Sequence, residues 1–522
     1  MSVTALTRSA LAEIWKIKTV AMVAVAMASG MAWAEEPPKM KMTTPIPPGI
    51  ATPDTLDTPI GKLNFKDGVP DAATAEKVYD NLDLMRGVQA YLDSIQIASM
   101  HGMRKGILEF GPENYTVLAF EDLMDSKALF LTPNTSSVYF VAWVDTKDTG
   151  PLVIETPPNV LGIIDDSWFH YVTDFGNAGP DKGKGGKFLL LPPGYEGDVP
   201  AGYHVARSGT YGNWVIWRGF QKDGDTGPAM KATTEGFRVY PLGQEDSAPK
   251  MAFVDVSGKN FNTIHAMDFS FWNEVNDVIQ AEPGESQNPE ILGQLASIGI
   301  VKGKPFKPDA RMTKILTQAA DIGAATVRSL AARPRDDSFY FYPGEGYWST
   351  PFVGGSYLFT DKNNARNLDA RAFFFFYATG ITPAMTQAPV GAGSQYAALF
   401  LDMDGNPLDG TKTYKVTLPK DIPAKDFWSF VVYDNQTRSM LQTDQQFPSV
   451  SSAKGKVKQN ADGTYDVYFG PKAPEGMEDN WVQTIPGKGW NMLLRLYGPL
   501  QPWFDKTWRP GKAEEVKLES AK

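Results

Sequence analysis

Residues 426–446 read DFWSFVVYDNQTRSMLQTDQQ, and the rest of the fold is organised around this stretch. Phe427–Tyr433 is aromatic and β-branched, which predicts a strand buried on both faces. Asp434–Thr437 then favours a turn, because Asp and Asn side chains bond the adjacent backbone. Arg438 and Gln442 follow directly. The stretch therefore predicts a rigid core strand that presents hydrogen-bonding side chains from the loop after it.

Length and composition bound the class of protein. The chain has 522 residues, enough for about two to four domains, and its 42% hydrophobic content supplies a packed core. Its 48 glycines, 39 prolines and 12% aromatic residues favour strands and turns over long helices. The formal net charge is −10 without a basic stripe, so nucleic acid is not an expected partner. The absence of cysteine excludes thiol nucleophiles, cysteine-ligated zinc and iron–sulfur clusters.

The N-terminus has the pattern of an export signal. Lys16 and Lys18 precede the apolar segment Thr19–Met31, which is too short to span a bilayer comfortably, and A-W-A ends at Ala34. We therefore expect cleavage after Ala34, a flexible leader over residues 35–57 and a periplasmic or secreted protein. No integral membrane segment is expected in the mature chain.

Hydrophobic periodicity changes along the mature chain. Residues 71–104 carry an apolar stripe at helical spacing, with Gly102 as the expected stop. Short strands then follow at close intervals to Gly219, including Trp168–Val172, which is typical of a β-sandwich. Residues 269–333 return to helical spacing, and a second set of strands runs from Tyr396.

The predicted fold is thus mainly β with a helical insert. Arg371–Ala378 (RAFFFFYA) is either a strand or a short buried helix, because its unbroken apolar pattern fits both. The expected domains are an N-terminal β-sandwich with a covering helix at 58–255, a helical region at 256–338 and a C-terminal β-domain at 339–522.

Several segments together resemble one family: Leu63–Val78, Thr132–Asp145, Gly391–Asp409, the stretch after Phe427, and Asn480–Pro510. It is the family of exported bacterial proteins that pair a domain of unknown function 1254 with a domain of unknown function 1214. The resemblance implies an immunoglobulin-like N-terminal sandwich, a helical middle and a jelly-roll-like C-terminal sandwich. It implies no settled reaction. Family members often carry an acidic residue where this chain has Ser136, which puts any role that needs a carboxylate there in doubt.

One pair of residues suggests catalysis. In D-D-S-W-F-H, strand alternation would place Asp166, Trp168 and His170 on one face, and a carboxylate beside an imidazole suits general-base work. The alternative is a hydrogen-bonded structural histidine at a sheet edge. The four histidines lie far apart and form no ligand motif, so we expect neither a metal nor another cofactor. No G-x-S-x-G elbow is present, which argues against an α/β-hydrolase.

Other residues suggest a ligand site. Aromatic side chains on or near core strands could form apolar walls, while buried arginines need anionic partners or several carbonyls. The candidate ligand-binding residues are Asn134, Tyr139, Tyr433, Asn435, Arg438, Gln442, Trp481 and Arg495.

Two functions stay open on the sequence. One is a hydrolase-like enzyme that uses Asp166 and His170 as base and an arginine to hold a small-molecule or carbohydrate-like substrate. The other is a non-catalytic binding or envelope-assembly protein. Convergence of a carboxylate, an imidazole and an arginine would favour the enzyme, and their separation would favour binding. The sequence leaves open whether the chain forms homo-oligomers.

Overall fold

The computed structural model describes residues 40–387 and 389–517, so the predicted signal sequence and its cleavage site lie outside the described residues. The chain consists of two compact units, and the boundary between them follows Met85. In the first unit, Asp71 starts α2 (Ala72–Leu108), because its Oδ1 accepts a hydrogen bond from the Thr74 amide at 2.7 Å. Three antiparallel strands precede it in the order β1 (Thr55–Thr58), β2 (Gly61–Lys66) and β3 (Val69–Pro70).

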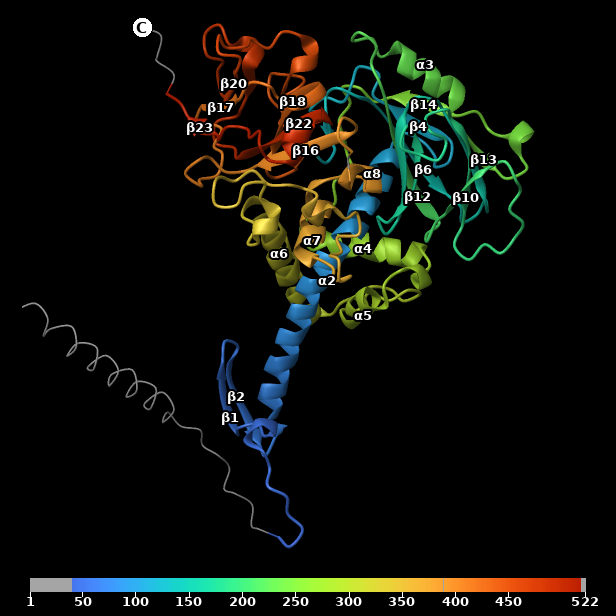
Figure 1. The fold of residues 1–522 in the computed structure, drawn as a ribbon. Helices are drawn as coiled ribbons and strands as arrows, with labels where there is room; N and C mark the ends of the chain where they lie inside the picture. The colour runs from blue at the N-terminus through green and yellow to red at the C-terminus, as the bar shows by residue number, and fades with distance from the viewer. Residues whose placement is uncertain (1–39, 388, 518–522) are drawn as a thin grey trace, which may run out of the picture. The chain divides into compact units, whose positions relative to one another are not determined.

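The second unit begins within α2 and contains two β-sandwiches (Figure 1). In the N-terminal sandwich, a six-stranded and a four-stranded sheet enclose one apolar core. The six-stranded sheet has the order β14 (Ala252–Asp255), β4 (Thr116–Ala119), β6 (Val138–Asp145), β12 (Gly212–Gly219), β8 (Leu161–Asp166), β9 (Tyr171–Gly176). The four-stranded sheet has the order β11 (His204–Arg207), β10 (Gly186–Leu191), β7 (Leu152–Thr156), β13 (Arg238–Pro241). This part of the chain also contains a two-stranded sheet, made by β5 (Ala128–Leu129) and β15 (Phe261–Asn262), and the helix α3 (Gly227–Gly236).

The helical insert is confirmed. It contains α4 (Ser270–Ala281), α5 (Pro289–Ser297) and α6 (Ala310–Ala332). The undecided Arg371–Ala378 segment is helical and belongs to α7 (Leu368–Tyr377), which is followed by the short α8 (Pro383–Thr386). Every residue of α7 from Ala370 to Tyr377 is buried, which explains why neither a strand nor a helix period was visible in the sequence.

The C-terminal sandwich is built around the opening stretch, which forms β18 (Ala424–Asp434). Its eleven residues pair with β22 (Trp490–Pro499) over most of their length, and a second sheet packs on them across a core of apolar side chains. The first sheet has the order β16 (Ser394–Leu399), β22, β18, β19 (Ser449–Ser451). The second sheet has the order β21 (Trp481–Gln483), β20 (Tyr465–Gly470), β17 (Tyr414–Leu418), β23 (Glu514–Glu515). The short helix α9 (Gln501–Phe504) follows β22. The fold class is therefore mainly β, as predicted.

Strand alternation explains a second buried layer. On β18, Phe430 and Val432 enter the core of the C-terminal sandwich, so Val431 and Tyr433 point to the other face, and they are fully buried too. On β6, Phe140 enters the N-terminal core while Tyr139 points away and is also buried. The faces of the β18 and β6 sheets that point away from their own cores are thus covered at these positions, and the hydrogen bonds described below join them.

Among the described residues, no helix combines the length and the apolar character needed to cross a bilayer.

Candidate functional site

Residues 131–137, which lead into β6, lie against the C-terminal sandwich. The Thr132 amide donates to the Arg438 carbonyl at 3.0 Å, and the Tyr433 hydroxyl donates to the Pro133 carbonyl at 2.6 Å. We call this segment the 131–137 loop. It carries N-terminal polar groups onto the outer face of the C-terminal sheet.

The backbone of this junction is strained on both sides. Thr132 has φ 41° and Arg438 has φ 61°, and the two residues are joined by the hydrogen bond just described. A β-branched residue at positive φ is uncommon, and such conformations cost on the order of 1–3 kcal/mol each. Backbone strain of this kind is concentrated at sites where surrounding contacts hold it in place.

Asn134 organises the loop beyond that junction. Its Oδ1 accepts from the amides of Ser136 and Ser137, both at 2.9 Å, and its Nδ2 donates to the Tyr139 hydroxyl at 2.7 Å. The Ser136 hydroxyl lies 3.2 Å from that of Tyr497 on β22. The loop therefore places serine and tyrosine hydroxyls beside the C-terminal sheet.

Arg495 enters the same region from β22. Its Nη2 donates to the Thr132 carbonyl at 2.7 Å and to the Tyr433 hydroxyl at 2.8 Å, and its guanidinium lies 4.8 Å from the ring centroid of Tyr396. The side chain is buried, and its Nε has no hydrogen-bond partner among the described residues. Burial also raises the pKa of Tyr433, although Arg495 opposes that shift.

A second arginine approaches from the N-terminal sandwich. Arg218 on β12 pairs with Tyr139 on β6 and interacts electrostatically with Tyr396 and Arg495. In the described part of the chain, neither guanidinium forms an ion pair with a carboxylate; the groups around them are tyrosines and carbonyls. We call this cluster the arginine–tyrosine site, and its members are Tyr139, Arg218, Tyr396, Tyr433, Arg495 and Tyr497.

Four of the predicted ligand-binding residues meet here, namely Asn134, Tyr139, Tyr433 and Arg495. The other four bond elsewhere. Asn435 Oδ1 accepts from Asn491 at 2.9 Å, Gln442 Nε2 donates to the Ser126 carbonyl at 3.0 Å, and Trp481 Nε1 donates to the Gly470 carbonyl at 2.9 Å. Their roles as ligand contacts stay predictions.

Arg438 is held inside the protein. Its Nε donates to the Phe376 carbonyl at 3.2 Å, its Nη1 donates to the Gln436 carbonyl at 2.8 Å, and the guanidinium lies 4.2 Å from the Phe376 ring centroid. Only 2% of the residue is exposed, and Nη2 has no partner among the described residues. Burial lowers the pKa of Arg438 to about 9, with a further contribution from the charge of Arg328. Its role as a ligand anchor stays a prediction.

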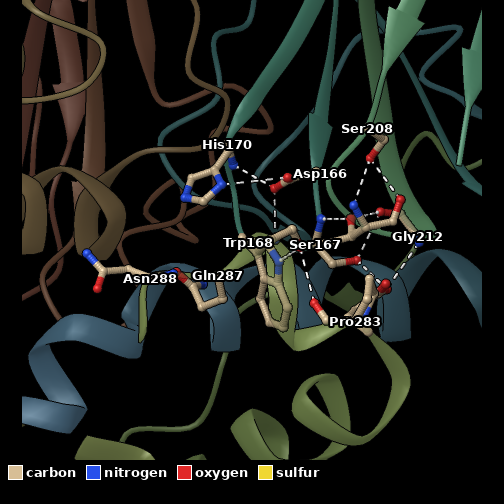
Figure 2. Close-up of polar contacts among 12 residues, drawn as sticks. Asp166, Ser167, Trp168, His170, Ser208, Gly212, Pro283, Gln287 and Asn288 are labelled. Atoms are coloured by element: carbon tan, nitrogen blue, oxygen red, sulfur yellow. Dashed lines mark hydrogen bonds and ion pairs between the residues drawn. The ribbon is translucent and has the colours of Figure 1, made fainter. Parts of the chain in front are cut away.

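Asp166 and His170 occupy a hairpin turn rather than one face of a strand, which corrects the expected strand at Trp168–Val172 (Figure 2). β8 ends at Asp166, and its Oδ1 accepts from the amides of Trp168 and His170 at 2.9 and 2.8 Å. The second carboxylate oxygen lies 3.6 Å from His170 Nδ1. Asp166 thus shapes the turn, while the half-exposed imidazole stays beside it. A catalytic role for the pair stays a prediction.

Neighbouring polar groups tie this hairpin to the helical insert. Glu282 follows α4, and its carboxylate accepts from the Ser167 hydroxyl at 2.8 Å and from the Tyr211 amide at 2.7 Å. Trp168 Nε1 donates to the Ser286 hydroxyl at 2.8 Å (Figure 2). These groups satisfy one another, so the region is well explained as a structural junction.

Sequence reasoning missed Arg218 and Tyr396. One signal was available for Arg218, because it shares a strand face with Trp214 and Ile216 in W-V-I-W-R-G. A charged residue on an otherwise apolar face indicates a partner on that side. The sequence alone does not reveal that the partner is the other sandwich.

No group of three histidine, aspartate or glutamate side chains within residues 40–387 and 389–517 is arranged to hold a metal ion. One small hollow, between Trp348, Leu401 and Lys512, has a volume of about 10 Å³, room for about one water, and none of its lining residues belongs to the arginine–tyrosine site.

Comparison with known proteins identifies both domains. Residues 116–241 match the family described as protein of unknown function DUF1254, and residues 393–501 match the family described as protein of unknown function DUF1214. The chain therefore pairs these two domains, which confirms the resemblance seen in the sequence. Tyr139 and Arg218 lie in the first matched segment, and Tyr396, Tyr433, Arg495 and Tyr497 lie in the second.

One solved structure supports the fold, and a second is reported only as a similar chain. The VPA0106 protein from Vibrio parahaemolyticus is 19% identical, with a TM-score of 0.50, and the match covers 84% of this chain and 100% of that one. A putative uncharacterised protein from Burkholderia cenocepacia is 13% identical over 84% of this chain and 96% of its own, with a TM-score of 0.37. No curated protein matches the chain.

Proposed function

We propose that this protein, which pairs the two domains of unknown function, binds a small carboxylate at the arginine–tyrosine site. The observation that carries the proposal is that Arg218 and Arg495 come together from different sandwiches with no carboxylate paired to either among the described residues. Two neighbouring cations repel each other, and desolvating them is unfavourable without a negative partner. A bound anion would supply that partner.

The geometry favours a carboxylate of small size. Guanidinium groups bind carboxylates through two parallel hydrogen bonds, and tyrosine hydroxyls can donate further ones. Arg495 is 4% exposed and Tyr497 is 8% exposed, while Arg218 and Ser136 are partly exposed. A ligand would therefore enter past Arg218 and Ser136, and the enclosed tyrosines would limit its size.

Of the two functions that the sequence leaves open, we propose binding, and the following contacts support that choice. The groups proposed as general base, Asp166 and His170, bond within their own hairpin, whereas Arg495 bonds to the 131–137 loop and to Tyr433. A hydrolase built on all of these residues would need the imidazole and an arginine at one substrate. Their contacts fall into two separate sets.

The proposal is tested by isothermal titration of the purified protein with sodium formate, acetate, malonate and benzoate, with sodium chloride as the reference salt. We expect saturable binding of at least one carboxylate. Arg218→Gln removes one charge-assisted contact, worth roughly 1.5–3 kcal/mol, and should weaken that binding about tenfold to a hundredfold.

Arg207→Gln is the matched control, because Arg207 is an exposed residue of β11 in the same sandwich. It should leave both affinity and melting temperature unchanged. Absence of binding by every carboxylate, or equal binding by the wild type and Arg218→Gln, would overturn the proposal.

We also propose that the mature protein is exported, on the basis of the basic flank, short apolar segment and A-W-A ending at Ala34. Mass spectrometry of protein from the cell envelope should find an N-terminus at Glu35. A terminus at Met1 or Ser2 in that fraction would contradict it.

A further inference from the structure

Two arginines meet at one carbonyl beside the turn that follows β18. Arg328 on α6 donates from Nη2 to the Gln436 carbonyl at 3.2 Å, and Arg438 donates from Nη1 to the same oxygen at 2.8 Å. The two guanidiniums also lie 5.6 and 4.2 Å from the ring centroid of Phe376 on α7, which packs beside α6 (Figure 1). We call Arg328, Phe376, Gln436 and Arg438 the arginine clamp.

The positive charge of the clamp is not balanced by carboxylates of the described residues. Asp434 interacts electrostatically with both Arg328 and Arg438, but its carboxylate forms an ion pair with Lys488. The same carboxylate accepts a hydrogen bond from the Gln436 amide at 2.7 Å. Three cations thus share one carboxylate, which leaves a formal excess of two positive charges. Like charges held this close repel each other, and burial strengthens the repulsion.

Two titratable neighbours of the clamp supply no negative charge. Burial raises the pKa of Tyr91, so its phenol stays protonated. His265 Nδ1 donates to the Ala266 carbonyl at 2.7 Å, and burial together with the charge of Arg438 lowers the pKa of His265 to about 3. The imidazole is therefore neutral. Compensation of the excess charge must come from solvent.

Arg438 provides a point of contact for a solvent anion. Its Nε and Nη1 donate to the carbonyls of Phe376 and Gln436, whereas its Nη2 is buried and has no partner in the described part of the chain. Leaving a desolvated guanidinium N–H without an acceptor is unfavourable. Arg328, whose Nη1 donates to the Asn435 carbonyl at 2.7 Å, is only partly buried, so an ion can approach the clamp from its side.

We propose that the arginine clamp binds one chloride ion, which accepts a hydrogen bond from Nη2 of Arg438 and is attracted by the charge of Arg328. A monatomic anion suits the clamp, because a carboxylate or phosphate would need several donors for its oxygens. Bound chloride lowers the excess charge from two to one and ties α6 and α7 to the turn after β18. The clamp shares no residue with the arginine–tyrosine site, so this inference does not depend on the proposed function.

Thermal unfolding gives the first test, with sodium chloride replacing sodium methanesulfonate at constant ionic strength. An ion that binds only the folded state raises the melting temperature once its concentration exceeds the dissociation constant. We expect this rise in the wild type. Arg328→Gln removes one of the two cations, so the rise should begin at a chloride concentration about tenfold higher or more.

Arg333→Gln is the matched control. Arg333 lies at the end of the same helix, is exposed, and bonds the Gly405 carbonyl at 2.9 Å. This variant and Arg218→Gln, which alters the arginine–tyrosine site, should respond to chloride as the wild type does. An equal response of the wild type and Arg328→Gln, or no response of the wild type, would overturn the inference.

Crystals soaked in sodium bromide give the second test, because bromide replaces chloride and is located by its anomalous scattering. We expect an anomalous peak within hydrogen-bond distance of Arg438 Nη2 in the wild type and no peak there in Arg328→Gln. A water molecule at Nη2, with bromide bound only elsewhere, would overturn the inference. Failure of every carboxylate to bind would remove the proposed function and leave this result standing.

Discussion

Arg438 shows how a single buried cation can hold a turn in place. Its guanidinium bonds the carbonyls of Phe376 and Gln436 and packs on the Phe376 ring, so it joins α7 to the turn after β18. Lysine lacks the planar fork needed for these contacts. Arg438→Lys should therefore lower the free energy of unfolding by about 1–3 kcal/mol, as measured by urea denaturation.

Arg509→Lys is the control for that substitution, because Arg509 is exposed and pairs with Glu345 at the surface. If Arg438→Lys were as stable as the wild type but bound the carboxylate less tightly, the structural account of Arg438 would be wrong. The ligand anchor predicted from the sequence would then hold.

Glu274 on α4 gives a prediction about pH. Its carboxylate accepts from the Ala266 amide at 2.9 Å, and burial raises its pKa from 4.5 to about 7. Because the pKa is higher in the folded state, the folded protein favours the protonated form. This stabilisation is fully present below pH 4.5 and is lost as the pH rises to about 7, with a slope of up to about 1.4 kcal/mol per pH unit.

Glu274→Gln keeps an oxygen for the Ala266 amide and removes this titration. Its melting temperature relative to the wild type should therefore rise between pH 4.5 and about 7, and then level off. A difference that stays constant over this interval would contradict the assignment.

At the scale of elements, Gly102 shows where sequence signals mislead. It was expected to end the first long helix, but α2 continues to Leu108. Because glycine has no side chain, the backbone of residues 263–265 can lie close to α2 at this position. A Cβ there would lie 2.8 Å from the Thr263 carbonyl oxygen and 3.0 Å from the His265 amide nitrogen. Gly102→Ala should destabilise the protein by about 1–3 kcal/mol despite the better helix propensity of alanine.

Gly293 in the middle of α5 is the matched control, because a Cβ there would meet nothing within 4 Å. Gly293→Ala should stabilise the protein by roughly 0.5–1 kcal/mol. Thermal unfolding of both variants is the measurement, and an equal gain in stability for both would disprove tight packing at Gly102.

The elements that were predicted well from the sequence are those whose pattern of apolar residues reflects the core into which they pack. Phe427–Tyr433 is confirmed as part of β18, and the helical spacing predicted for residues 269–333 is confirmed at its C-terminal end by α6. The hairpin turn at Asp166 was missed. The turn depends on two backbone amides that donate hydrogen bonds to one carboxylate, and strand alternation in the sequence does not reveal such contacts. Tyr433 was selected as an aromatic side chain on a core strand and Arg495 as an arginine on one, whereas Tyr396, also on a predicted strand, was not selected.

The arrangement of the whole molecule was harder to predict, since the outer faces of the two sandwiches cover each other through long-range contacts. Tyr433 is central to that junction because its hydroxyl donates to Pro133 of one sandwich and accepts from Arg495 of the other. Tyr433→Phe removes both of these hydrogen bonds and should lower the free energy of unfolding by about 1–3 kcal/mol.

Calorimetry measures this effect, and Tyr465→Phe, at a partly exposed tyrosine of β20 in the C-terminal sandwich, is its control. In the wild type, the two sandwiches should unfold cooperatively with each other. In Tyr433→Phe, this cooperativity should be reduced. Equal melting curves for the wild type and both variants would show that the hydroxyl does not tie the sandwiches together.

The central claim, a carboxylate held by arginines from both sandwiches, is tested most directly by a crystal structure of the protein saturated with the tightest-binding carboxylate from the titration. The account predicts electron density for the carboxylate within hydrogen-bond distance of the guanidinium groups of both Arg218 and Arg495. Density for the ligand at another place, with both arginines contacting only tyrosines, carbonyls and water, would contradict it.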